Sequence, residues 1–212
     1  MSLELYLLRH GETTYSKTGS YCGELDAELT PEGTQMAQEF AEAYRALPWA
    51  AVYVSPMKRT IATAKPLCDA LRIDMQLRDG LKEIRYGKWE DQTVDYVKQH
   101  YPDDYLRWLA EPAWNPPTGG ETGVEIASRA ALVIREIQEK YADGNVLVVS
   151  HKATIRIILC SLLGIDLGRY RDRLDAPAGS LSLLKFDAHG PLLQALGERS
   201  YMDERLRSLR GT

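Results

Sequence analysis

One stretch near the N-terminus decides the fold: Leu5-Tyr6-Leu7-Leu8-Arg9-His10-Gly11-Glu12-Thr13. Its first half is a leucine-rich apolar run, which is typical of a buried strand. The run ends in a cation, an imidazole and a glycine, and glycine lets the backbone turn sharply. In an open α/β sheet, ligands bind outside the carboxyl ends of the strands. Arg9 and His10 are therefore placed where chemistry is usually done, although a strand that ends in a solvated Arg-His pair has the same pattern.

The same pattern recurs at a second strand. Val146-Leu147-Val148-Val149 is apolar without alternation, as in a central strand covered on both faces, and His151 follows it directly after Ser150. Arg59 comes soon after a third apolar run, 51–54. Phosphoryl transfer requires cations that neutralise the phosphate oxygens and a nucleophile in line with the leaving oxygen. Convergence of the strand ends would supply both, because arginine binds phosphate through two donors and a neutral imidazole can attack phosphorus.

Strands alternate with helices along the chain. Proline after a capping residue opens helices at Thr30-Pro31 and Ser55-Pro56, and a capping box opens another at Thr122. Gly164 closes the helix that follows His151. This alternation predicts an α/β fold of three layers, α/β/α, with a mostly parallel central sheet, helices on both faces and a C-terminal hairpin. The predicted strands are 3–9, 51–54, 75–78, 146–149, 181–186 and 192–196.

The sequence predicts a single domain, residues 1–198, followed by a charged tail, 199–212, that frays. Residues 11–29 are expected to form a loop, and Pro66 is expected to kink or restart its helix because proline removes a backbone donor. Residues 93–121, rich in proline and aromatic residues, form a long connection of the kind that serves as a binding loop or lid. A covering flap without function has the same composition.

The composition is that of a soluble globular protein, with 44 % hydrophobic and 26 % charged residues. The net charge of −4 argues against general affinity for nucleic acids, and no apolar run approaches the length of a membrane span. Three widely spaced cysteines without a CxxC pair predict free thiols in a reducing compartment and no metal cluster. Because no secretory signal is present either, these features predict a cytoplasmic protein.

Five motifs, in order along the chain, are similar to those of the histidine phosphatase superfamily, also called the phosphoglycerate mutase-like family. The first is Leu8-Arg9-His10-Gly11-Glu12-Thr13, and the loop and helix that follow continue the pattern from Gly23 to Gly33. The resemblance covers most of the chain and implies the fold predicted above. The other motifs are Ser55-Pro56-Met57-Lys58-Arg59-Thr60-Ile61-Ala62-Thr63-Ala64, Leu81-Lys82-Glu83 with Gly87 and Trp89-Glu90, Gly120-Glu121 with Arg129, and Val149-Ser150-His151.

The resemblance implies a catalytic set. His10 is the histidine that becomes phosphorylated, and Arg9 and Arg59 bind phosphate. His151 stabilises the transferring group. The proton donor falls on Glu83, which must be protonated near neutral pH to serve the leaving oxygen. The alternative carboxylates are Glu12, Glu90 and Glu121.

Two positions depart from the family's pattern. Ser16 stands where an asparagine is common, and its hydroxyl can still donate a hydrogen bond over a shorter reach. Lys152 stands after the second histidine, where glycine or alanine is usual. Its ammonium either reads a carboxylate or second phosphate of the substrate or leaves the pocket. The predicted phosphate- and substrate-binding residues are Arg9, Ser16, Cys22, Gly23, Arg59 and Lys152.

The predicted activity is that of a phosphoric monoester hydrolase. His10 attacks a small-molecule phosphomonoester of the phosphoserine, phosphosugar or sugar-acid phosphate class. Glu83 protonates the leaving alcohol and then helps a water molecule attack the phosphohistidine. No metal or other cofactor is expected, because the arginines and the second histidine neutralise the charge.

Two other functions fit the same motifs. A cofactor-dependent phosphoglycerate mutase needs extra residues that close over the site, and the segment 84–121 is short for that purpose. A non-catalytic phospholigand-binding module is favoured by loss of a histidine or an arginine, and none is lost. The expected partner is a small phosphorylated metabolite, with neither nucleic acid nor membrane involved, and a homodimer is left open.

Overall fold

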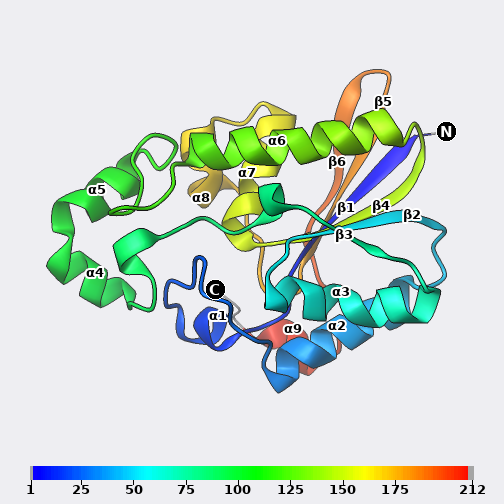
Figure 1. Cartoon of the computed structure of the whole chain (residues 1–212), viewed down its shortest axis with the longest axis horizontal. Coiled ribbons are helices and arrows are strands. Elements are labelled where there is room, and N and C mark those ends of the chain that lie inside the picture. Colours follow the sequence, from blue (N-terminus) through cyan, green and yellow to red (C-terminus); the bar gives the residue numbers. More distant parts are fainter. Residues whose placement is uncertain (1, 210–212) are drawn as a thin grey trace.

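A six-stranded sheet forms the centre of the computed structural model, which describes residues 2–209 (Figure 1). The strand order is β3-β2-β4-β1-β5-β6. The first four strands in this order run parallel, and β5 and β6 form an antiparallel hairpin beside β1. This confirms the predicted mostly parallel sheet with a C-terminal hairpin. The strands are β1 Leu3–Arg9, β2 Trp49–Val54, β3 Met75–Leu77, β4 Gly144–Ser150, β5 Leu181–Asp187 and β6 Gly190–Glu198.

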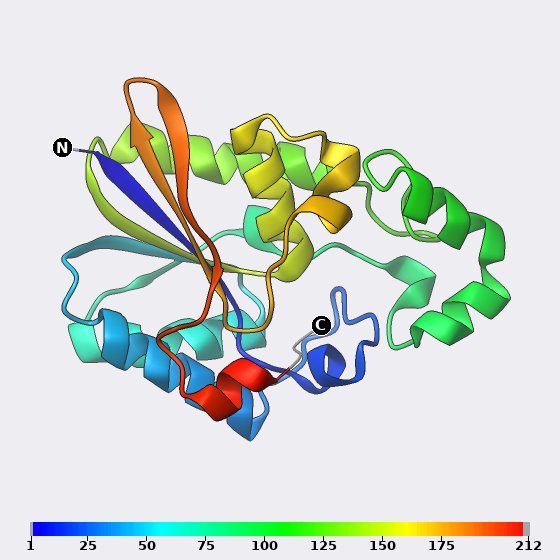
Figure 2. The ribbon, with the colours of Figure 1, turned by 180° about the vertical axis from the view of Figure 1, so that it is seen from behind.

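Helices cover both faces of the sheet, as Figures 1 and 2 show. Side chains of a strand alternate between faces, so Leu5 and Leu7 of β1 pack against one helical layer, and Tyr6 and Leu8 against the other. All four are buried, which explains the apolar run without alternation. The layer on Leu5 and Leu7 holds α6 Gly123–Lys140, α7 Lys152–Leu163 and α8 Tyr170–Arg173; the other holds α2 Pro31–Tyr44, α3 Lys58–Leu71 and α9 Glu204–Ser208.

Three of the expected helix caps are confirmed. Thr30 accepts a hydrogen bond from the backbone N–H of Gly33 at the start of α2. Thr122 and Glu125 form the capping box of α6, and Gly164 ends α7 in the left-handed conformation. These caps fix the N-termini of α2 and α6 and the C-terminus of α7.

Two expectations about α3 are wrong. The helix begins at Lys58 with Met57 as its capping residue, so Ser55 does not cap it. The Ser55 hydroxyl instead bonds His151 across the sheet. The expected restart at Pro66 is also wrong, because α3 continues to Leu71, with Leu67 and Cys68 buried against the sheet despite the missing donor; a kink at Pro66 stays a prediction.

Two segments expected to be irregular contain short helices. Residues 11–29 include α1 Thr14–Thr18, which Thr13 and Ser16 cap reciprocally. The expected fraying of the tail is wrong for its described part, because Leu206 of α9 is fully buried against Met36 and Met202. Residues 210–212 of that tail lie outside the described residues.

The segment 93–121 projects beyond one end of the sheet (Figure 2). It contains α4 Val94–His100 and α5 Pro102–Ala110, and Val97 and Trp108 pack there with Tyr21. The short 3-10 turns before and after it are Asp79–Leu81, Gly87–Trp89 and Leu167–Arg169. Its function as a lid stays a prediction, as does the division into one domain and a tail.

Candidate active site

The two histidines meet because their strands are neighbours. β1 and β4 pair in parallel with Arg9 opposite Ser150, so the residues that follow them, His10 and His151, leave the sheet at the same edge. The backbone N–H of His10 donates to the carbonyl of Ser150 at 3.1 Å. The two imidazole centroids are 5.2 Å apart. Convergence of the strand ends, expected from the fold class, is therefore confirmed.

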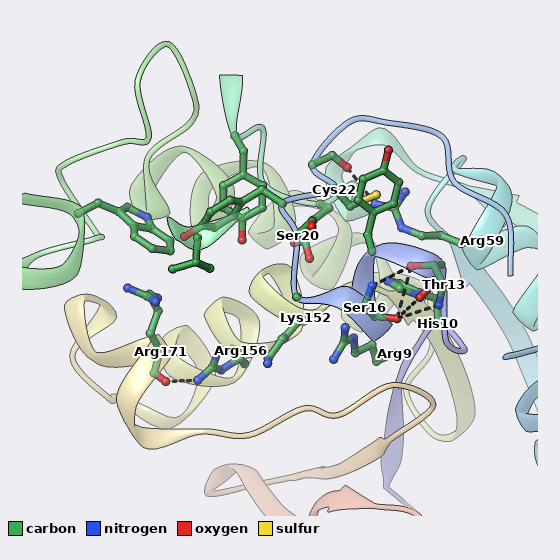
Figure 3. Close-up of a pocket in the computed structure, with 18 residues that line it drawn as sticks. Arg9, His10, Thr13, Ser16, Ser20, Cys22, Arg59, Lys152, Arg156 and Arg171 are labelled. Atoms are coloured by element: carbon green, nitrogen blue, oxygen red, sulfur yellow. Dashed lines mark hydrogen bonds between the residues drawn. The ribbon is translucent and has the colours of Figure 1, made fainter. Parts of the chain in front are cut away.

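A hydrogen bond to one ring nitrogen of His10 decides which nitrogen carries the proton. Its Nδ1 lies 2.7 Å from the carbonyl oxygen of Gly11, which can only accept, so Nδ1 carries the proton. Burial, with the charges of Arg59 and Arg9, holds the pKa of His10 well below 6.5. The ring is consequently neutral at pH 7, and its Nε2 has a free electron pair. His10 lines the cavity shown in Figure 3.

A backbone crossing holds His10 in place. A Cβ atom on Gly11 would lie 2.3 Å from the carbonyl oxygen of Gly33, and one on Gly33 would lie 2.1 Å from the carbonyl of Glu12. Only glycine at both positions allows this approach of α2 to the turn after β1. The N–H of Gly11 also donates to the Thr63 hydroxyl at 3.0 Å, which ties the turn to α3.

Two buried arginines flank His10. Arg9 is 3 % exposed and donates to the carbonyl of Ala176 at 2.7 Å; burial lowers the pKa of Arg9 to about 10, which leaves it cationic at pH 7. Arg59 is 1 % exposed, and its guanidinium donates to the carbonyls of Gly23 and Leu25 at 2.9 and 2.8 Å. Both side chains line the cavity, so two fixed cations lie beside His10 there.

His151 lies behind this pair rather than in the cavity. It is fully buried and is not among the described residues that line the cavity. Its Nδ1 accepts from Arg59 Nε at 3.1 Å, so the proton is on Nε2, which donates to the Ser55 hydroxyl at 2.8 Å. Burial and the charge of Arg59 hold the pKa of His151 well below 6.5. The neutral ring therefore positions Arg59.

Glu83 is the acid of the expected set that faces the cavity. Its carboxylate accepts from the backbone N–H groups of Ala153 and Thr154, both at 3.3 Å, at the N-terminus of α7. Arg129 donates to the carbonyls of Lys82 and Glu83, which fixes the loop that carries the acid.

The alternative carboxylates have other partners. Glu12 accepts from the Thr30 hydroxyl at 2.9 Å, and Glu121 pairs with Arg129 at 2.8 Å. Glu90 accepts from the N–H groups of Glu24 and Tyr86, both at 3.1 Å. None of these three described carboxylates lines the cavity.

The remaining expected residues also line this cavity, which has a volume of about 230 Å³. Ser16 is buried, and its hydroxyl donates to the Thr13 carbonyl at 3.0 Å within the cap of α1. Cys22 donates to the Leu25 carbonyl, and burial raises the pKa of its thiol. Gly23 has a φ of +54° and offers its carbonyl to Arg59. Lys152 reaches the cavity from the first turn of α7.

Two further cations of the cavity were missed from the sequence. Arg156 and Arg171 line its far side, beyond Lys152 (Figure 3). Arg156 is the one charged residue inside the apolar part of α7, four residues after Lys152, and this spacing puts both on one helical face. Arg171 stands in a charged stretch without a distinguishing pattern. Among residues 2–209, no group of three or more His, Cys, Asp or Glu side chains is placed to hold a metal ion.

A family model described as histidine phosphatase superfamily, branch 1, matches residues 5–199. The chain belongs to this family. Phosphoserine phosphatase 1 of Hydrogenobacter thermophilus is 32 % identical over 168 residues, 79 % of this chain and 80 % of that protein. Adenosylcobalamin/alpha-ribazole phosphatase of Escherichia coli is 27 % identical over 163 residues, 77 % and 80 % of the two chains. The solved structure of Bacillus stearothermophilus YhfR, 24 % identical, aligns with a TM-score of 0.87 over 95 % of this chain and all of that one, which shows the fold.

Family membership confirms two predictions made from the motifs. The fold of this histidine phosphatase is phosphoglycerate mutase-like, and the protein is a phosphoric monoester hydrolase. No helix within residues 2–209 has the length and apolar character needed to cross a membrane.

Proposed function

We propose that this histidine phosphatase hydrolyses a small-molecule phosphomonoester through a phosphohistidine on His10. The observation that carries the proposal is the state of that ring. Its Nδ1 is held by the Gly11 carbonyl at 2.7 Å, it is neutral, and it faces a cavity flanked by the cations Arg9 and Arg59. A neutral imidazole with one nitrogen tied to a carbonyl is oriented for attack through the other.

The proposed reaction has two steps. In the first, the Nε2 electron pair of His10 forms a bond to phosphorus while the bond from phosphorus to the ester oxygen breaks, and Glu83 gives its proton to the leaving alcohol. In the second, Glu83 takes a proton from a water molecule whose oxygen forms a bond to phosphorus while the bond from phosphorus to Nε2 breaks, which frees His10 and releases inorganic phosphate. Arg9 and Arg59 neutralise the equatorial oxygens in both steps, as cations aimed at developing charge do.

Glu83 has to carry a proton before the first step. The backbone N–H groups of Ala153 and Thr154, at the N-terminus of α7, hold its carboxyl group beside the cavity. The product alkoxide is then quenched by a group already within the cavity.

His151 has one donor to offer to the transferring group. Its Nε2–H now donates to the Ser55 hydroxyl at 2.8 Å, while its Nδ1 is held by Arg59. A direct contribution to the phosphoryl group requires Nε2–H to exchange Ser55 for a phosphate oxygen. We propose this exchange in addition to the positioning of Arg59.

The substrate class is a small phosphorylated metabolite. Named relatives include a phosphoserine phosphatase and an alpha-ribazole phosphatase, which supports a search among amino-acid, sugar and sugar-acid phosphates. Cys22, Cys68 and Cys160 are all free thiols, which fits the expected reducing compartment and hence a cytoplasmic protein. A homodimer stays a prediction.

A phosphate-release assay over such esters tests the proposal. The wild-type protein should release phosphate, and His10→Ala should abolish release although Arg9 and Arg59 remain. A parallel assay for conversion of 3-phosphoglycerate into its 2-phospho isomer separates hydrolysis from the mutase reaction. Isomerisation that exceeds hydrolysis would replace our proposal by a mutase, and phosphate release that survives His10→Ala would remove His10 as the nucleophile.

A further inference from the structure

The cavity holds more positive charge than one phosphate group requires. Five arginine and lysine side chains line it against one carboxylate, Glu83, although the whole chain has a net charge of −4. Arg9 and Arg59 flank His10 and suffice to face a phosphoryl dianion. The other three cations, Lys152, Arg156 and Arg171, remain to be explained.

These three cations form a row that leads away from the nucleophile. Figure 3 shows Lys152 next to Arg9, then Arg156, then Arg171. Lys152 and Arg156 come from successive turns of one face of α7, and Arg171 comes from α8, which packs on α7. All three line a second, open cavity, of about 480 Å³, that shares them with the first. We call Lys152, Arg156 and Arg171 the distal cation row.

Aromatic rings hold the outer end of the row. The Arg171 guanidinium carbon lies 3.6 Å from the centroid of the Trp108 ring, and Trp108 is buried. The Arg156 guanidinium lies over the Tyr170 ring at 6.0 Å and also donates to the carbonyl of Arg171. Stacking on an aromatic face orients a guanidinium without neutralising it. The row is thus a built feature and keeps its charge.

Carboxylates lie near the row, since Asp172 and Asp175 line the same open cavity, but they do not pair with it. No ion pair within 4.0 Å forms between its members and a carboxylate of residues 2–209. The Arg156 Nε atom is buried and lacks a hydrogen-bond partner there. Lys152 faces the cations Arg9 and Arg156 and the carboxylates Glu83 and Asp175, and burial together with the two cations lowers its pKa to about 8. Three adjacent cations without an ion pair call for an anion from outside.

We propose that the distal cation row is a second anion subsite, which binds a carboxylate or phosphate that the substrate carries in addition to the ester phosphate cleaved at His10. This inference rests on the proposed function only in that the ester phosphate is placed at His10. The row excludes neutral sugar or alcohol phosphates as preferred substrates, since they leave its charges unpaired.

The same charges rank the acidic substrates. Phosphoserine carries an ammonium beside its carboxylate, and the row repels that ammonium. A phosphorylated hydroxy acid without an amino group, or a bisphosphate, gains the attraction without this penalty. The preferred substrate is therefore a two-headed anion, with phosphoserine behind it and neutral phosphate esters last.

A matched pair of ligands tests the subsite. 3-Phosphoglycerate and glycerol 3-phosphate differ only in a carboxylate that replaces a hydroxymethyl group. Calorimetry measures their binding to His10→Ala, which keeps every cation, and phosphate release gives kcat/KM for the wild-type protein. The same measurements on fructose 1,6-bisphosphate and fructose 6-phosphate identify a second phosphate as the preferred anion. The variants are Lys152→Met and Arg171→Gln, and Arg135→Gln on the exposed face of α6 is the matched control for loss of one charge.

We expect at least one anionic ligand to bind about tenfold or more tightly than its neutral partner, which is the gain from one charge-assisted contact. Lys152→Met and Arg171→Gln each reduce that ratio, and Arg135→Gln leaves it unchanged. Equal binding within both ligand pairs overturns the subsite. So does a ratio of anionic to neutral affinity that survives in the variant that combines Lys152→Met with Arg171→Gln. A preserved binding preference with no phosphate release from any ester overturns the hydrolytic function and leaves the subsite standing. Phosphate release without a binding preference overturns the subsite and leaves the hydrolytic function standing.

Discussion

Replacing Glu83 by glutamine separates the proposed acid from the rest of the site. The amide has the size of the carboxyl group and keeps an oxygen that can accept from the N–H groups of Ala153 and Thr154. It cannot give a proton to a leaving alcohol. The substitution therefore removes acid chemistry while Arg9, Arg59 and His10 keep their places.

The size of the effect depends on the leaving group. General acid catalysis contributes about 10²- to 10⁴-fold, so kcat/KM for an alkyl phosphate should fall by that factor in Glu83→Gln. p-Nitrophenolate is a weak base that leaves without a proton, so kcat/KM for p-nitrophenyl phosphate should fall by less than about tenfold. Loss of the charge at the N-terminus of α7 costs about 1 kcal/mol of unfolding free energy, which leaves the variant folded.

Steady-state kinetics on both substrates, with denaturant unfolding beside them, measures these quantities. Glu90→Gln is the matched control, because Glu90 also accepts from two backbone N–H groups but does not line the cavity. Its effect should be small and equal for the two substrates. An equal loss on both substrates in Glu83→Gln, or no loss on either, refutes the assignment of Glu83 as the acid.

Four other outcomes follow from the site. His151→Ala should lower kcat/KM by about 10²-fold or more, as loss of a fixed donor does. Ser55→Ala should lower it by less than tenfold, because Ser55 bonds Nε2–H only until a phosphate oxygen replaces it. Equal losses in the two variants would contradict the proposed exchange. Both buried histidines have a lowered pKa, so below pH 6.5 the unfolded chain binds protons that the folded chain does not. The free energy of unfolding should therefore fall by about 2 kcal/mol between pH 6.5 and 5.5. His10→Asn should reduce that slope in thermal melts, whereas a flat profile would speak against neutral rings. Lys152 loses its charge as pH rises through about 8, so the preference for 3-phosphoglycerate over glycerol 3-phosphate should decline from pH 7 to 9 in the wild-type protein and stay constant in Lys152→Arg. EDTA should leave phosphate release unchanged, and a loss that added divalent cations restore would show a metal requirement.

The sequence predicted the sheet and the position of His10 well, for a local reason. Apolar runs without alternation predict central strands, and a histidine directly after such a run has to lie at the sheet edge. Parallel pairing of β1 and β4 then brings His10 and His151 together, and Arg59 follows from the first turn of α3, just after β2, the neighbour of β4. Each strand could be recognised from its own residues and those directly after it, and the fold class supplied the convergence of the strand ends.

The parts that failed depend on distant partners. Ser55 has the pattern of a helix cap, but its hydroxyl bonds His151. The two residues meet because β2 and β4 are neighbours in the sheet, and the local sequence does not show this. α1 is too short to show a period, and α9 is held by contacts with α2, far away in the sequence. Arg171 belongs to the cavity only because α8 folds back on α7 and stacks it on Trp108.

Trapping the covalent intermediate tests directly whether His10 carries the phosphoryl group during turnover. The wild-type protein is mixed with an excess of a substrate that it hydrolyses, quenched within the first turnover under alkaline denaturing conditions that preserve phosphohistidine, digested and mapped by mass spectrometry. We expect one phosphoryl group on the peptide that contains His10 and none on the same peptide of His10→Ala. A phosphoryl group on another residue, or rapid turnover with no phosphorylated peptide, would contradict it.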